Sequence, residues 1–148
     1  RDLVRSRGLG DVYKRQDDFA KFEGKTGPYI QYAIARINSI LRKAGEIKPG
    51  KIVITNPEER DLALKLMQLN NIVLRTHEAK EPSIISDYAY TLAQAFSSFY
   101  NTSPIMSAAT PEQAASRLQI AKIVRDVLTL LLNLLGIEAP EVMLKKAE

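Results

Sequence analysis

Hydrophobic residues recur along this chain at intervals of three and four, a spacing typical of helices that bury one face. The first such run opens at Pro28, and a proline suits the first position of a helix because its missing N–H would have no partner there. Glycine and proline between residues 45 and 50 end the run. At about 100° per residue its apolar stripe covers a narrow arc. The stripe consists of Ile30, Ile34, Ile37 and Leu41.

A second group on the same helix points away from that stripe and comprises Tyr29, Tyr32 and Arg36. Aromatic rings stack on unpaired bases, and arginine either stacks or binds phosphate oxygens with its forked donors. The group therefore suits flat, negatively charged ligands. Alternatively, the tyrosines cover a neighbouring helix and Arg36 forms a surface ion pair. Spacing alone leaves both interpretations open.

The segment Lys51–Thr55 has the composition of a strand but no nearby partner, so we expect an extended linker or a short helical turn there. Asn56 is predicted to cap a helix that begins at Pro57 and ends at residues 70–71. The buried face of this helix should consist of Leu62, Leu66 and Leu69. A further short helix is expected over residues 72–80, with Val73, Leu74 and His77 turned inward.

Two longer helices follow. The first starts at Pro82, and Tyr100 lies off its apolar stripe at the end of the helix. This stripe comprises Ile85, Tyr88, Leu92, Phe96 and Phe99. The second begins with a capping box at Thr110 and stops at Gly136. It carries two adjacent apolar stripes, formed by Ala121, Val124, Leu128, Leu131 and Leu135 and by Ile120, Ile123, Val127, Leu130 and Leu134. A helix apolar over so much of its circumference should be central, so the fold is predicted to be an all-α helical bundle.

Composition restricts the chemistry that the chain can perform. Its 148 residues fit one domain with a substantial core. There are no cysteines and one histidine, which excludes disulfides, thiolate sites and multi-histidine metal sites. No apolar run approaches the length of a membrane span. We therefore expect a cytoplasmic, monomeric domain that binds no metal, no cofactor and no membrane.

The net charge of +4 is concentrated at one end of the chain. Residues 1–16 carry five basic side chains against two acidic ones, while the remaining residues carry sixteen against fifteen. The first sixteen residues show no apolar periodicity, and we expect an unstructured or foreign tail there, followed by one helical domain over 17–148. A basic arm that grips phosphates is the alternative.

The segment Phe22–Tyr32, with the sequence FEGKTGPYIQY, resembles the opening of the carboxy-terminal anticodon-binding (DALR) domain of arginyl-tRNA synthetases. Further blocks agree with that family in the same order. They are the helix around residues 58–66, the "LA--F--FYN" block at Leu92–Asn101, and Leu134–Ile137 at the end of the longest helix.

The resemblance implies an all-helical domain that binds the anticodon loop of an arginine tRNA. By the same resemblance, Tyr29 and Tyr32 would stack on loop bases, Arg36 would bind a base edge or phosphate, and Tyr100 and Met143 would close the pocket. The family usually ends in Glu-Arg-Met, whereas this chain has Val142 in place of the arginine and continues for five residues after Met143.

The ATP-binding signatures of the synthetase catalytic domain do not occur in this sequence. The resemblance therefore implies an arginine–tRNA ligase as the parent enzyme, with ATP bound in a part that this sequence lacks and no activity from this part alone. Two alternatives are a helical protein–protein interaction module and the related domain of a synthetase of another specificity, such as a cysteinyl enzyme or a glycyl subunit.

Overall fold

The structure is a computed structural model that describes residues 26–143, and this range is helical with no strand. The expected all-α bundle is therefore confirmed. The helices, in order along the chain, are α2 (Gly27–Lys43), α3 (Pro57–Met67), α4 (Leu69–Ala79), α5 (Ser83–Thr102) and α6 (Pro111–Leu134).

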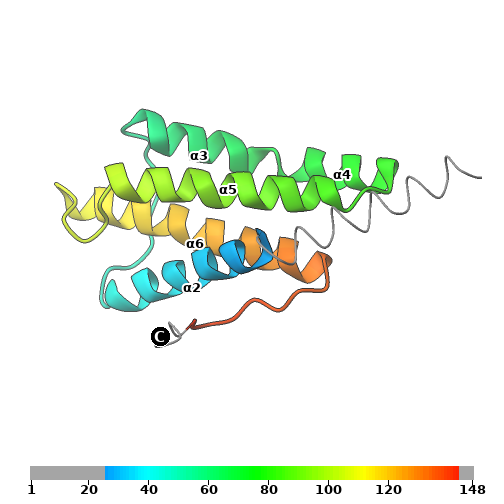
Figure 1. The fold of residues 1–148 in the computed structure, drawn as a ribbon. Coiled ribbons are helices and arrows are strands. Elements are labelled where there is room, and N and C mark those ends of the chain that lie inside the picture. Colours follow the sequence, from blue (N-terminus) through cyan, green and yellow to red (C-terminus); the bar gives the residue numbers. More distant parts are fainter. Residues whose placement is uncertain (1–25, 144–148) are drawn as a thin grey trace, which may run out of the picture.

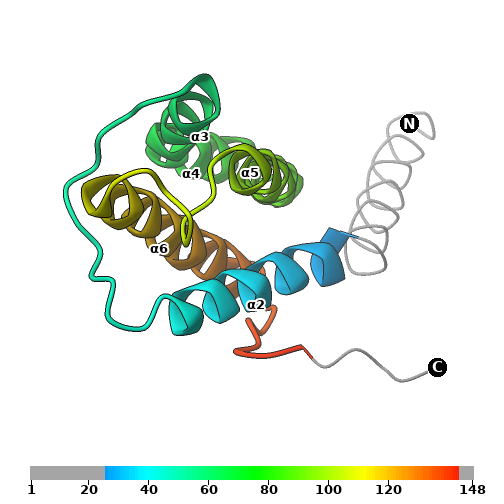
Figure 2. The ribbon, with the colours of Figure 1, turned by 90° about the vertical axis from the view of Figure 1, so that its left-hand side faces the viewer.

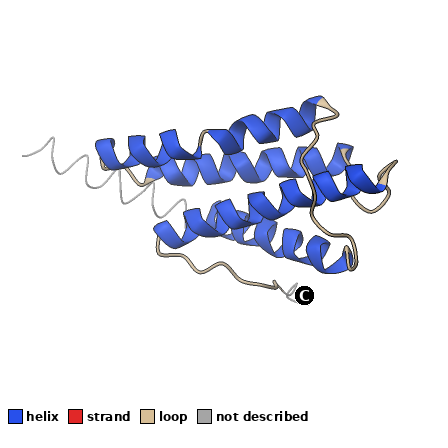
Figure 3. Ribbon diagram, turned by 180° about the vertical axis from the view of Figure 1, so that it is seen from behind, coloured by secondary structure: helices blue, strands red, loops and turns tan. Residues whose placement is uncertain are grey.

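Helices α5 and α6 form the centre of the bundle (Figure 1). Helix α2 packs on both of them, while α3 and α4 follow one another along the other side of α5 (Figures 1 and 2). Seen from behind, long loops join α2 to α3 and α5 to α6, whereas α3 and α4 are nearly continuous (Figure 3). The main partner of α2 is α6, from which it is separated in the sequence by α3, α4 and α5.

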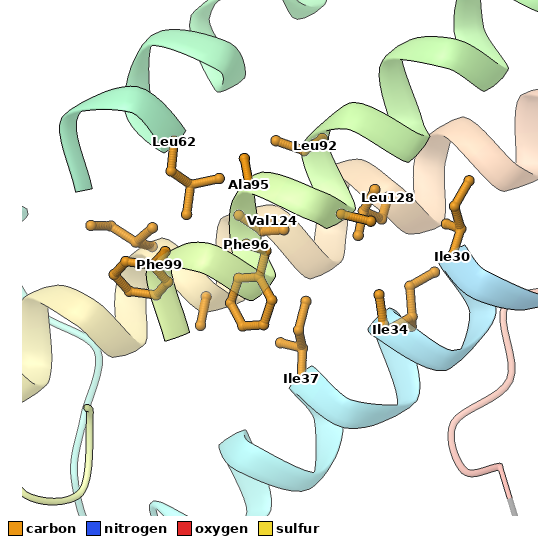
Figure 4. Close-up of a cluster of buried hydrophobic side chains, with 14 of the residues drawn as sticks. Ile30, Ile34, Ile37, Leu62, Leu92, Ala95, Phe96, Phe99, Val124 and Leu128 are labelled. Atoms are coloured by element: carbon orange, nitrogen blue, oxygen red, sulfur yellow. The ribbon is translucent and has the colours of Figure 1, made fainter. Parts of the chain in front are cut away.

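One hydrophobic core joins α2, α5 and α6 (Figure 4). Ile30, Ile34 and Ile37 of α2 point toward Phe96 of α5 and Leu128 of α6, and all five side chains are almost fully buried. Burial of side chains of this size contributes about 1.5–3 kcal/mol each. The predicted stripe of α2 is confirmed at these three positions, and Leu41 is half-buried at its end.

The linker between α2 and α3 is extended and forms no strand, which confirms that expectation. It is attached to α6 by hydrogen bonds at three points. Gly50 donates its N–H to the Ala115 carbonyl at 3.0 Å, Val53 exchanges two hydrogen bonds with the Ser116 hydroxyl, and the Thr55 hydroxyl accepts from Nε2 of Gln113 at 3.3 Å. A Cβ at Gly50 would lie 2.9 Å from the Cβ of Ala115. The close approach of linker and helix therefore requires glycine at this position.

The sequence prediction was partly wrong for α3 and α4. Asn56 caps α3 through a bond from the Glu59 N–H, as expected, but α3 ends at Met67 and residues 70–71 lie inside α4. Val73, Leu74 and His77 are exposed rather than inward, with Leu74 at 59%. Within the described range, helix α4 contacts mainly α5 along one narrow face, and none of its residues is fully buried.

The two long helices follow the prediction more closely. All five residues of the α5 stripe are buried, and Thr110 caps α6 by accepting from the Gln113 N–H at 3.2 Å. Gly136 adopts a positive φ of 74° just beyond the helix, as glycine does at such ends. The second apolar stripe of α6 is the exception, because Leu130 and Leu134 are exposed. Helix α6 is central, but among residues 26–143 its last turns have packing partners on only one side.

A buried ion pair, which the sequence did not reveal, connects α3 and α6 to each other and to two of the loops. Nε of Arg117 on α6 lies 2.7 Å from Oε1 of Glu59 on α3, and both side chains are buried. Arg117 also donates to the Pro104 carbonyl at 2.9 Å. The second carboxylate oxygen of Glu59 accepts from the N–H and the hydroxyl of Thr55. Burial alone would raise the pKa of Glu59, but these hydrogen bonds and the Arg117 charge outweigh it and lower that pKa.

Tyr88 joins α5 to α3 through a hydrogen bond. Its hydroxyl donates to the Lys65 carbonyl at 2.7 Å, and burial raises the pKa of Tyr88 to about 12.

No helix in the described range is long and apolar enough to cross a membrane. Residues 1–16, for which we expected an unstructured or foreign tail, and residues 22–25 of the Phe22–Tyr32 block lie outside the described residues.

Candidate nucleic-acid interface

The outward face of α2 carries the side chains singled out from the sequence. Tyr32 is the most exposed of them, at 51%. Tyr29 and Arg36 are half-buried on one flank of this face, because both lie nearer to α5. At about 100° per residue they lie roughly 40–60° from Tyr32. The three side chains therefore form one continuous strip along α2.

Arg36 contacts Tyr100, so the structure brings together two predicted site residues from different helices. The guanidinium carbon of Arg36 lies over the Tyr100 ring, 4.8 Å from its centre. Such a contact contributes about 0.5–1 kcal/mol at an exposed site. Tyr100 in turn lies stacked beside the buried Phe96 ring, with centroids 6.2 Å apart. The core thus supports Tyr100, and Tyr100 supports Arg36.

Tyr29 has a partner that the sequence analysis did not name. Its ring centroid lies 5.1 Å from that of Tyr90 on α5, with the rings tilted by 52°. Tyr90 lies roughly 160° around α5 from the buried Tyr88, so the same off-stripe argument used for Tyr29 could have found it. The interpretation that tyrosines cover a neighbouring helix therefore applies to Tyr29 in part, and Tyr32 is the one that faces outward.

Met143 lies in the tail, residues 136–143, which follows α6. The tail runs along α2 on the side away from α5, in both views (Figures 1 and 2). It thus lies on the flank of the outward face opposite to Arg36 and Tyr100. Met143 is 40% exposed. Arg36 therefore contacts Tyr100, and Tyr29 contacts Tyr90, on one flank of the outward face. The tail lies on the opposite flank, with Tyr32 between the two.

The chemistry of this surface is stacking combined with positive charge. Arg36 lies within the strip, and Arg42 and Lys43 are exposed on the last turn of α2. In the part of the chain that the structure describes, no three His, Asp or Glu side chains gather as metal ligands would. Rings and guanidinium groups in this arrangement bind planar groups with adjacent phosphates.

Comparison with known proteins identifies a family. The family model for the DALR anticodon binding domain matches residues 30–143, more than half of the chain. This match includes four of the five predicted site residues, since Tyr29 precedes it by one position.

Among similar proteins, the arginine–tRNA ligase of Hyphomonas neptunium is 45% identical over 144 residues, which cover 96% of this chain and 24% of that protein. The ligase of Pediococcus pentosaceus is 44% identical over 128 residues, or 86% of this chain and 22% of that protein. The chain thus spans about a quarter of the length of these relatives.

Solved structures agree with the sequence comparison. The arginyl-tRNA synthetase of Thermus thermophilus superposes with a TM-score of 0.73 and 40% identity, over 82% of this chain and 22% of that one. That of Plasmodium falciparum superposes with a TM-score of 0.70 and 26% identity, over 86% and 23% of the two chains. Sequence motifs, fold and family match therefore agree that this chain belongs to the family of DALR anticodon-binding domains.

Proposed function

We propose that this chain binds the anticodon loop of an arginine tRNA on the outward face of α2 and reads the middle base of the anticodon. All arginine codons have G in the middle, so the base to be read is C. The observation that carries the proposal is the strip formed by Tyr32, Tyr29 and Arg36, with Arg36 lying over Tyr100. Single-stranded loops are the part of RNA whose bases can stack on such a strip.

In this proposal the residues have separate roles. Tyr32, the most exposed, stacks on a loop base. Arg36, supported by Tyr100, binds a base edge or a phosphate with its forked donors. Tyr29 shares its ring contact with Tyr90 and borders the strip, and Met143 borders it from the tail.

We further propose that the longer protein is an ATP-dependent arginine–tRNA ligase acting in the cytoplasm as a monomer. This chain spans about a quarter of the ligases it resembles, so it would supply tRNA recognition while ATP and arginine bind elsewhere in the protein. Purified by itself, the chain should then show no arginine-dependent pyrophosphate exchange.

Binding of an anticodon stem-loop tests the proposal. We expect Tyr32→Ala to weaken binding by roughly 1–3 kcal/mol, while Tyr32→Phe, which keeps the ring, stays close to the unsubstituted chain. Met67→Ala, on the exposed side of α3, is the control for surface truncation. A stem-loop whose middle C is replaced should bind more weakly at the same salt concentration. Equal affinity for the two stem-loops would contradict recognition of that base, and binding of a different tRNA's anticodon would indicate another specificity.

A further inference from the structure

The tail is held along α2 through its main chain. Nε2 of Gln31 donates to the Glu138 carbonyl at 2.8 Å, and Nδ2 of Asn38 donates to the Glu141 carbonyl at 3.3 Å. Gln31 and Asn38 are seven residues apart, so they lie within roughly 20° of one another on the helix. The tail therefore passes from the first turns of α2 toward its last turns.

The spacing of the two amides matches the tail. Seven residues of helix rise about 10.5 Å, and three residues of extended chain span about 10 Å. Both acceptors are main-chain carbonyls, which every residue has. The attachment of the tail to α2 therefore depends on the number of residues between positions 138 and 141 rather than on their side chains.

A third side chain fixes the orientation of the Asn38 amide. Nη1 of Arg125 on α6 donates to Oδ1 of Asn38 at 3.5 Å, while its Nε and Nη2 donate to Asp126. Arginine has donors only, so the oxygen of the amide must face Arg125 and the NH₂ group must face Glu141. Arg125 thereby connects the tail contact to the bundle.

We infer that Gln31 and Asn38 are positioning residues for RNA recognition, which hold the tail in register so that Met143 borders the outward face of α2 opposite to Arg36. This inference rests on the proposed function. Around α2, Tyr32 lies between the two flanks: roughly 40° from Arg36 and about 100° from Gln31. The loop would then lie over Tyr32, between Arg36 with Tyr100 on one side and the tail on the other.

The test is the double variant Gln31→Glu/Asn38→Asp, which keeps the size of both side chains but replaces each donor to the tail with a carboxylate oxygen. The carboxylate introduced at position 38 would still accept from Arg125, so the contact between α2 and α6 is preserved. The matched control is Gln68→Glu/Asn71→Asp, which adds the same charge at two exposed positions at the start of α4. Thermal melts establish that each variant is folded.

The first measurement does not depend on RNA. Because the chain has no cysteine, a single Val142→Cys substitution accepts a spin label in the tail. We expect the label to become clearly more mobile in the double variant and to be unchanged in the control. Equal mobility in the two would overturn the inference.

The second measurement is the stem-loop affinity lost in the double variant. It is made once with Met143 in place and once in a Met143→Ala background. Loss of two hydrogen bonds should reduce the held fraction of the tail, so we expect binding about threefold to tenfold weaker. If the amides act by positioning Met143, this loss should disappear in the Met143→Ala background. If the affinity losses of the double variant and of Met143→Ala add in full, the double variant acts by simple charge repulsion, and the inference is overturned. Failure of the unsubstituted chain to bind would instead refute the proposed function, and the spin label would still decide whether the amides hold the tail.

Discussion

Two arginines of this domain occupy opposite environments. Arg117 is buried, pairs with Glu59 at 2.7 Å and also donates to the Pro104 carbonyl. Arg36 is half-buried, lies over the Tyr100 ring and forms no ion pair with any residue between 26 and 143. A guanidinium whose donors are used inside the protein contributes to the fold. One that rests on a ring at the surface can direct its donors to a ligand.

Substitution of the buried arginine should have the largest effect. Arg117→Met leaves the Glu59 carboxylate buried without its partner, and we expect a loss of about 3–5 kcal/mol in the free energy of unfolding. Denaturant titration measures it. The double variant Glu59→Leu/Arg117→Met should recover part of the loss, because it removes both charges. If Arg117→Met were as stable as the unsubstituted chain, the pair would contribute nothing to the fold and the contrast between the two arginines would fail.

Acid should weaken the same pair to a smaller extent. The pKa of Glu59 is lower in the folded chain than its ordinary value of 4.5. Its contribution to stability is therefore complete above about pH 4.5 and is lost as the pH falls through the lowered value. Melts between pH 6 and pH 3 should show a steeper loss for the unsubstituted chain than for Glu59→Gln. Parallel curves for the two proteins would show that Glu59 has no lowered pKa.

Substitution of the surface arginine, Arg36, should affect binding more than stability. Arg36→Met should cost under about 1 kcal/mol of stability, as surface changes usually do, but weaken stem-loop binding by roughly 1–3 kcal/mol. Arg75→Met, at an exposed position of α4, is the control for loss of one positive charge. Equal losses of affinity in the two variants would mean that Arg36 acts only through net charge.

Substitution of Tyr100, whose ring lies beneath Arg36, should have the smallest effect on stem-loop binding. Tyr100→Leu removes a contact of about 0.5–1 kcal/mol with the guanidinium, and we expect affinity to fall by a similar amount. Tyr100→Phe keeps the ring and should bind normally. If the phenylalanine variant binds as weakly as the leucine variant, the hydroxyl of Tyr100, and not its ring, is what recognition requires.

The sequence predicted the features that depend on neighbouring residues in the chain. The caps at Asn56 and Thr110, the stop at Gly136 and the stripe of α5 involve residues within a few positions of each other. Helical phase also indicated that Tyr32 faces away from the core, whereas Tyr29 packs partly against the core and Tyr90.

What could not be predicted depends on which elements pack together. The pairing of Glu59 with Arg117 joins residues 58 positions apart, and an acidic residue in a first helical turn already has a local explanation in the helix dipole. Val73, Leu74, Leu130 and Leu134 are apolar at helical spacing, yet they are exposed because no described element lies against them. Periodicity shows which face could be buried, and only the packing shows whether a neighbour is present.

The long separation between α2 and α6 has a consequence for the order of folding. Helices α3, α4 and α5 follow one another with only a few residues between them, whereas α2 must close a loop that includes these three helices before it reaches α6. Closing longer loops costs more entropy, and contacts distant in sequence form more slowly. We therefore expect α2 to dock late, so that Ile37→Ala speeds unfolding and leaves the refolding rate almost unchanged. The surface proposed to read the anticodon would then be the last part of the domain to assemble.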